Sequence, residues 1–113
     1  MQKNDNEQID DELNRIKQVI IKKLEEVNDP EFGVDIVNLG LIYEIKINKD
    51  EKKAYIKMTM TTPTCPFAAL ILREVQEKLS KIDELDEIHV ELVWDPPWSA
   101  DMMSEEAKLM LGI

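Results

Sequence analysis

Apolar residues along this 113-residue chain change their spacing repeatedly between the period of a helix and that of a strand. An apolar stripe three or four residues apart predicts a helix over residues 10–27, which ends because Pro30 disfavours helical backbone before it. Alternation then predicts two strands, over residues 41–48 and 54–61, joined by the polar turn NKDEKK. These strands form an antiparallel hairpin with one apolar face.

The same change of period recurs in the second half of the chain. Helical spacing covers residues 67–82, and strand alternation covers residues 88–94, whose apolar set ends with Trp94 and is expected to face the core. Ser104 can cap a last short helix that stops at Gly112. The order α-β-β-α-β-α places a helix between the second and third strands, and a right-handed crossover makes those strands parallel. The fold class is α+β, a two-layer α/β sandwich with helices on one face of a small mixed sheet.

Length and charge limit the organisation and the partners of the chain. We expect a flexible N-terminal tail over residues 1–9 and one domain over residues 10–113. The net charge of −10, from 24 acidic and 14 basic residues, argues against binding to nucleic acid or to an anionic membrane. No apolar run approaches the roughly 20 residues of a membrane span. A free cysteine and no signal-like start predict a cytoplasmic protein.

The single cysteine, Cys65, lies between Pro63 and Pro66 in the stretch TTPTCPF. One cysteine permits neither an internal disulfide nor a cysteine-rich metal site. It can be a small core residue, since free cysteine is often buried, or a reactive thiol. If Pro66 is the first helical residue, Cys65 is the N-cap, and its sulfur faces free N–H groups and the positive end of the helix dipole. That position favours the thiolate, which attacks electrophiles and binds metals.

The sequence gives little support for a cysteine enzyme. A cysteine nucleophile needs a base, usually histidine, and His89 is the only one in the chain. Its place in the third strand alternates with the apolar set, so we expect it to point to solvent. Metal binding remains: an iron–sulfur cluster normally takes four protein ligands, and this chain supplies one thiolate. Such a cluster must be shared between chains, completed by other ligands or held weakly, as suits a carrier.

Three blocks of the sequence together resemble a known family. They are DPEFGVDIVNLGLIYEI, MTTPTCPF and VELVWDPPWSADMMSEEAKLMLG, and the resemblance runs from Ile16 to Gly112. The family is that of the SufT- and PaaD-like iron–sulfur maturation proteins, related to the cluster-carrying domain of NifU-type scaffolds. PaaD-type members carry a further cysteine-rich segment, so the resemblance favours the stand-alone SufT type. It implies a compact α+β domain that assembles iron–sulfur clusters or inserts them into other proteins.

The resemblance also implies a site. The family's motif cysteine corresponds to Cys65, the expected metal ligand, and its acidic loop corresponds to Asp29 and Glu31. Thr62 and Thr64 add hydroxyl groups that can reach the sulfur or a ligand. The alternatives are that Asp29 and Glu31 only brace their loop, and that the threonines only satisfy backbone groups. Many relatives carry aspartate before the Leu-Gly pair of the first block, where this chain has Asn38, so Asn38 has less weight as a ligand.

The leading hypothesis is a cluster assembly or carrier factor that is not an enzyme and acts through Cys65. Its cofactor would be a transient iron–sulfur cluster or iron, and its partners a scaffold and apo-target proteins. A homodimer with two Cys65 side chains on one cluster, or a partner that supplies the missing thiolates, would complete the ligand set. The alternatives are an accessory subunit of a phenylacetyl-CoA-type multicomponent oxygenase and an interaction adaptor with an incidental thiol.

Overall fold

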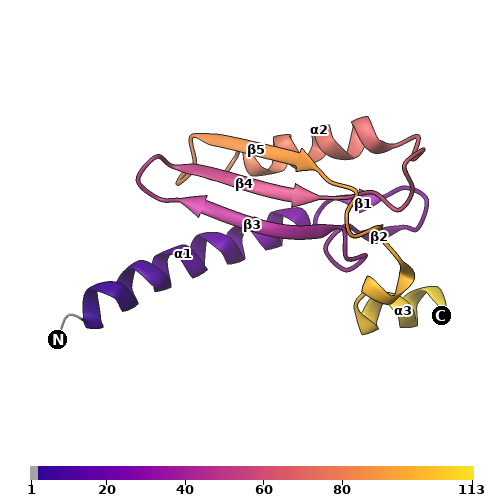
Figure 1. The fold of residues 1–113 in the computed structure, drawn as a ribbon, viewed down its shortest axis with the longest axis horizontal. Coiled ribbons are helices and arrows are strands. Elements are labelled where there is room, and N and C mark those ends of the chain that lie inside the picture. The colour runs from indigo at the N-terminus through magenta and orange to yellow at the C-terminus, as the bar shows by residue number, and fades with distance from the viewer. Residues whose placement is uncertain (1–2) are drawn as a thin grey trace.

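A three-stranded mixed sheet forms one layer of the protein (Figure 1). The structure, a computed structural model, describes the backbone of residues 3–113 and the side chains from residue 11 onward. The strands are β3 (Ile42–Asn48), β4 (Lys53–Met58) and β5 (Glu87–Leu92), in the order β3-β4-β5. The pair β3–β4 is antiparallel and the pair β4–β5 is parallel. The hairpin and the parallel crossover expected from the sequence are confirmed.

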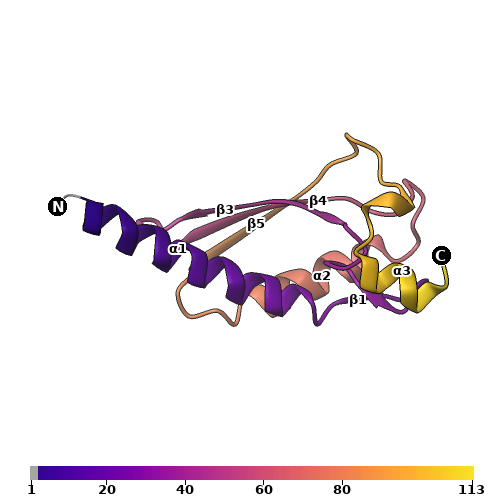
Figure 2. The ribbon, with the colours of Figure 1, turned by 90° about the horizontal axis from the view of Figure 1, so that it is seen from below.

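Two helices form the second layer. The helices α1 (Lys3–Leu24) and α2 (Ala68–Leu79) lie on the same side of the sheet (Figure 2). In β4 the inward residues Ala54, Ile56 and Met58 are buried, whereas Tyr55 and Lys57 between them are exposed. The two-layer α+β fold is therefore confirmed, with its core between the helices and the sheet. The largest fully buried side chains are Ile20, Leu24, Val27, Ile36, Leu39, Leu41, Ile56, Met58, Met60, Ile71, Val75 and Leu79.

Some element boundaries differ from those expected. The helix α1 begins at Lys3 and ends at Leu24, where expectation placed it over residues 10–27. Its last turn gives way to a tighter one, in which the Val27 amide donates to the carbonyl of Leu24. The flexibility expected for residues 1–9 stays a prediction. No helix in the described part of the chain is both long enough and apolar enough to cross a membrane.

Short elements gather at the end of the molecule away from the start of α1 (Figure 1). The strands β1 (Asn28–Asp29) and β2 (Val34–Asp35) form a small antiparallel pair between α1 and β3. The 3₁₀-helix η1 (Ala100–Met102) and the helix α3 (Glu105–Leu111) follow the sheet. The expected ends of α3 are confirmed: the Ser104 hydroxyl accepts from the Ala107 amide at 3.1 Å, and Gly112 adopts φ 73°.

Candidate functional site around Cys65

Cys65 lies in the loop that connects β4 to α2. Its amide donates to the Thr62 carbonyl at 3.2 Å, and its carbonyl accepts from the Ala68 amide at 3.3 Å, so two tight turns fix its backbone. Its side chain is 8% exposed and belongs to the hydrophobic core. The thiol is therefore held at the edge of the core with a small part of the residue exposed.

The expected N-cap role of Cys65 is wrong. The helix α2 begins at Ala68, and its N-cap is Phe67, whose backbone angles of φ −100° and ψ 7° lie outside the helical region. Pro66 lies in the turn before that residue and is not the first helical residue. Phe67 packs against the core, and this contact together with the Cys65–Ala68 turn delays the start of the helix.

The surroundings of the sulfur favour the protonated thiol. Burial raises the pKa of the Cys65 thiol, and the charges of Asp29 and Glu31 raise it further, against a lowering by the Phe67 amide. The Sγ atom also donates to Oε1 of Glu31 at 3.9 Å, which stabilises the S–H form. The expectation that this position favours the thiolate is wrong for the chain alone, because burial together with the two carboxylates outweighs the one amide. A bound cation has the opposite effect on a thiol, since a metal-coordinated thiol is deprotonated.

Asp29 is fully buried, and only one of its two carboxylate oxygens has a hydrogen-bond partner within the range that the structure describes. Its Oδ1 atom accepts from the Glu31 amide at 2.8 Å, so the carboxylate braces the loop as one alternative expected. Its Oδ2 atom has no hydrogen-bond partner in the described part of the protein. A buried polar atom without a partner costs roughly 1–3 kcal/mol, and more when it is charged. Asp29 thus makes a bracing hydrogen bond with one oxygen, its other oxygen lacks a partner among the described residues, and a ligand role for it stays a prediction.

The structure brings together the two carboxylates and the thiol that were expected at the site, those of Asp29, Glu31 and Cys65. Glu31 links them, because its amide binds Asp29 and its carboxylate accepts from Cys65, although 34 residues separate Glu31 from Cys65. The threonines differ: the side chains of Thr62 and Thr64 are both exposed. Thr62 contributes its carbonyl oxygen, which accepts from the Cys65 amide. A role for either hydroxyl in binding stays a prediction.

Asn38 connects the acidic loop to the C-terminal segment. Its Nδ2 donates to Oδ1 of Asp35 at 2.7 Å, and its amide donates to the other carboxylate oxygen of Asp35 at 3.0 Å. Its Oδ1 accepts from the Ser104 hydroxyl at 2.7 Å, and its carbonyl accepts from the Ser104 amide at 2.8 Å. The carboxamide is used as both donor and acceptor. Asn38 thus has a structural role that the sequence pattern alone did not indicate.

The two tryptophans differ in their surroundings. Trp98 is partly buried, its Nε1 donates to the Leu39 carbonyl at 2.7 Å, and its ring centroid lies 6.2 Å from that of Phe32. Trp94 is 44% exposed, so the expectation that it packs in the core is wrong. The strand β5 ends at Leu92, and the alternation that would turn Trp94 inward does not extend to it.

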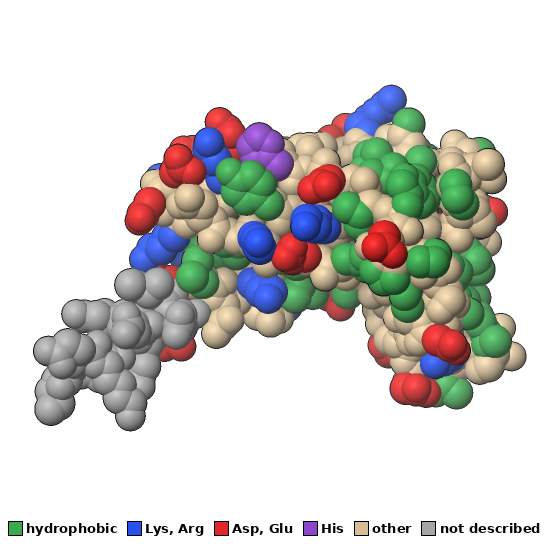
Figure 3. Space-filling view, in the orientation of Figure 1, with side chains coloured by type: hydrophobic (Ala, Val, Ile, Leu, Met, Phe, Trp, Pro, Cys, Tyr) green, Lys and Arg blue, Asp and Glu red, His purple; other side chains and the backbone are tan. Residues whose placement is uncertain are grey.

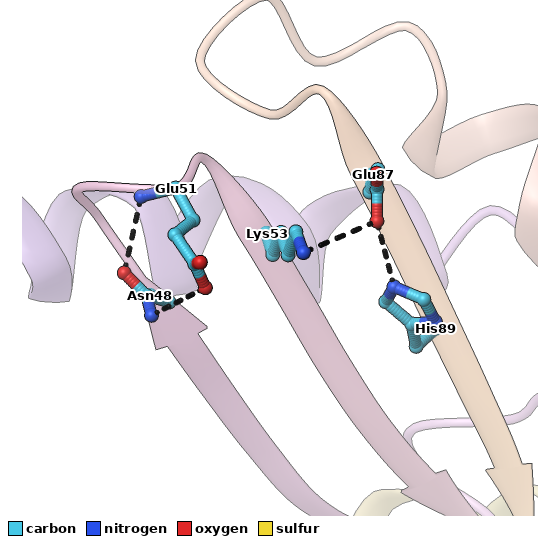
Figure 4. A network of polar contacts seen from close by, with 5 residues as sticks. All are labelled: Asn48, Glu51, Lys53, Glu87 and His89. Atoms are coloured by element: carbon cyan, nitrogen blue, oxygen red, sulfur yellow. Dashed lines mark hydrogen bonds and ion pairs between the residues drawn. The ribbon is translucent and has the colours of Figure 1, made fainter.

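His89 lies on the sheet face opposite the helices, as expected. Its ring stacks on Tyr55 with centroids 5.1 Å apart, and its Nε2 lies 3.0 Å from Oε2 of Glu87, which also pairs with Lys53 at 3.7 Å (Figure 4). Cys65 belongs to the core on the helix side. A cysteine–histidine pair is therefore not formed, and the His89 network is an exposed polar cluster on the sheet.

The fold and the site define a class of protein. It is a small α+β domain that presents one thiol with two carboxylates, and no group of three or more His, Cys, Asp or Glu among the described residues can hold a metal ion by itself. The chain belongs to the iron–sulfur cluster assembly protein family, whose profile matches residues 17–92. The resemblance to SufT-like proteins inferred from the sequence is confirmed.

Individual relatives agree with this family. The Fe–S protein maturation auxiliary factor YitW of Bacillus subtilis is 46% identical over 98 residues, which cover 87% of this chain and 95% of that protein. The Fe–S protein maturation auxiliary factor SufT of Staphylococcus aureus is 45% identical and covers 77% of this chain and 98% of its own length. A solved domain of unknown function from Bacillus anthracis matches with a TM-score of 0.83 at 46% identity, covering 88% of this chain and 94% of that one.

Proposed function

We propose that this protein is an iron–sulfur maturation factor that takes up iron or a cluster transiently at Cys65 and passes it to apo-proteins. The observation that carries the proposal is the Oδ2 atom of Asp29, which is buried without a hydrogen-bond partner in the same cluster as the buried thiol. A metal ion would satisfy that oxygen and would also lower the pKa of Cys65 by coordinating the thiolate. Binding of the cargo would thus give the Asp29 oxygen a partner and stabilise the Cys65 thiolate.

The donor set suits iron as cargo. Cysteine thiolate is the usual protein ligand of iron–sulfur clusters, and carboxylate oxygens also bind iron. Cys65 would be the thiolate ligand, Asp29 an oxygen ligand, and Glu31 the acceptor that holds the thiol proton through its hydrogen bond until the metal arrives. Thr62 and Thr64 are exposed beside them and could contact the cargo from outside.

An incomplete ligand set favours transfer over storage. A cluster normally needs four protein ligands, so a cluster at Cys65 takes its other ligands from a second protein or a second copy. Release then requires few bonds to this chain to break. We place the protein in the cytoplasm as a non-catalytic factor that works between a scaffold and apo-targets, in keeping with relatives named maturation auxiliary factors.

Anaerobic reconstitution with iron and sulfide tests the proposal. We expect wild-type protein to develop visible absorbance with iron and sulfide bound, and Cys65→Ser to lose most of both while keeping its circular dichroism spectrum. His89→Ala, which changes an exposed residue on the other sheet face, is the matched control and should behave as wild type. Equal iron in wild type and Cys65→Ser would contradict the proposal, and no chromophore in either would favour the adaptor hypothesis.

A further inference from the structure

The end of the molecule that holds Cys65 is strongly acidic. Three segments build this end: residues 28–43, residues 59–73 and residues 93–113. Their basic residues are Arg73 and Lys108, and Lys108 pairs with Glu105 at 4.0 Å. Together they carry the carboxylates of Asp29, Glu31, Asp35, Asp95, Asp101, Glu105 and Glu106. A protein that docks here meets an excess of negative charge: seven carboxylates, of which that of Asp29 is buried, against two basic side chains.

Large apolar side chains are exposed at this end. Trp94 is 44% exposed and Leu70 is 42% exposed. Figure 3 shows hydrophobic side chains gathered near the end of β5 and the adjoining part of α2. The contact between Gln76 Nε2 and the Ile88 carbonyl, at 3.4 Å, aligns the helix with the strand. Leu70 lies in the first turn of α2 and Trp94 lies two residues past the end of β5, and the loop that holds Cys65 leads into that first turn, so both residues lie toward the Cys65 end (Figure 1).

Three hydrogen bonds hold the loop around Trp94 in place. The Val93 amide donates to the Met58 carbonyl at 2.8 Å. The Tyr43 hydroxyl donates to the Pro96 carbonyl at 2.8 Å, and Trp98 Nε1 donates to the Leu39 carbonyl at 2.7 Å. The loop is anchored, yet it leaves a tryptophan half in water. A rigid exposed tryptophan loses little conformational entropy on binding, and tryptophan is enriched at the centres of protein interfaces.

We propose that Leu70, Trp94 and Asp95, which we call the Trp94 surface, dock a partner protein that presents an apolar pocket rimmed by Lys and Arg. Charge complementarity decides the occupant, because a second copy of this chain would bring its own carboxylates against these and like charges repel. The inference rests on the proposed function: a partner docked beside Cys65 is placed to give or receive the cargo. Trp94 supplies the apolar anchor, and Asp95 supplies the charge.

Genetic complementation separates the failure of this inference from that of the proposed function. In a Staphylococcus aureus strain that lacks SufT, the readout is the activity of an endogenous iron–sulfur dehydratase. We expect wild type to restore it, Cys65→Ser to lose it, and Trp94→Ala to lower it at least five-fold. Tyr55→Ala, which removes a 41%-exposed aromatic from the open sheet face, should match wild type. If wild type does not restore the activity, or if Cys65→Ser does, the proposed function is overturned. If Trp94→Ala restores the activity fully while Cys65→Ser does not, only the docking inference is overturned.

Photo-crosslinking tests contact and charge directly in the same cells. The photoreactive residue p-benzoylphenylalanine replaces Trp94 in one variant and Tyr55 in the other, and the crosslinked peptides are sequenced. We expect position 94, and not position 55, to crosslink to peptides of another protein that carry Lys or Arg. The crosslink should fall several-fold with Asp95→Lys and remain with Asp50→Lys, an exposed change in the β3–β4 turn. Absence of a crosslink, a crosslink to a second copy, or indifference to Asp95→Lys overturns the inference.

Discussion

The Sγ atom of Cys65 donates a hydrogen bond to Oε1 of Glu31 across 3.9 Å. This contact joins the loop between β4 and α2 to the acidic loop that holds Asp29 and Glu31. Because the carboxylate accepts from the thiol and adds negative charge beside it, it stabilises the protonated sulfur. The chain alone thus keeps its only thiol in the form that reacts slowly with electrophiles.

Alkylation of Cys65 should therefore have a high pH midpoint. Burial and the two carboxylates raise the pKa of the thiol, so the iodoacetamide rate should rise with pH at values above those of an ordinary cysteine. Glu31→Gln should move the midpoint to lower pH, because it removes a negative charge beside the sulfur. Mass spectrometry of the alkylated protein over a pH series measures this. Glu77→Gln, an exposed change on α2, is the control, and an unchanged profile in Glu31→Gln would show that Glu31 does not act on the thiol.

The same pKa shift links stability to pH. The folded-state pKa of Cys65 is raised above its unfolded value, so the folded state favours the protonated thiol. The resulting stability is fully present below the ordinary thiol pKa and is lost as pH rises through the folded-state pKa. Wild type should thus lose more urea stability in alkaline buffer than Cys65→Ser does. Parallel pH dependences in the two proteins would contradict the assignment.

Asp29 is expected to combine a bracing oxygen and a ligand oxygen. Asp29→Asn keeps an acceptor for the Glu31 amide but removes the negative charge, so it should lower iron retention after reconstitution while the protein stays folded. Asp29→Ala removes the brace as well and should also destabilise the fold by about 1–2 kcal/mol. Iron analysis and urea unfolding of both variants separate the two roles. Full iron retention in Asp29→Asn would exclude this residue as a ligand.

The side-chain hydrogen bond between Asn38 and Asp35 can be tested by exchanging the two residues. Asn38→Asp would replace the donor to Asp35 with a second carboxylate, so it should cost about 1–3 kcal/mol of unfolding free energy. Combining it with Asp35→Asn restores one donor and one carboxylate, and should recover most of the loss. Urea unfolding of the two single variants and the double variant measures the coupling. An additive double variant would mean that the side-chain contact carries no stability.

Gly40 lies directly against the backbone of Met102 in the C-terminal segment. It adopts φ 82°, and a Cβ atom there would overlap the carbonyl oxygen of Met102. Gly40→Ala should therefore cost about 3 kcal/mol or more, from left-handed strain and displacement of backbone. Gly33→Ala is the matched control, because Gly33 also has positive φ, at 70°, but a Cβ there meets no atom within 4 Å. Its cost should be about 1 kcal/mol, and equal losses would mean that the overlap is relieved.

The fold could be predicted from local patterns in the sequence, whereas the site could be predicted only in part. Helical and strand periods act over a few residues, so the sheet, the crossover and the capping of α3 by Ser104 were predictable. The N-cap assignment of Cys65 failed because the packing of Phe67 determines where α2 begins. The prediction that Trp94 is buried failed because β5 ends before this residue, and periodicity does not show where a strand ends.

The sequence by itself determined the layer order and the single thiol, because these depend on composition and on residues close together in the chain. Only the tertiary structure decided the state of that thiol. Its pKa depends on burial and on Asp29 and Glu31, and Glu31 lies 34 residues before Cys65 in the chain. Desolvation and charge act through distance in space, and that distance is set when the helix layer closes on the sheet.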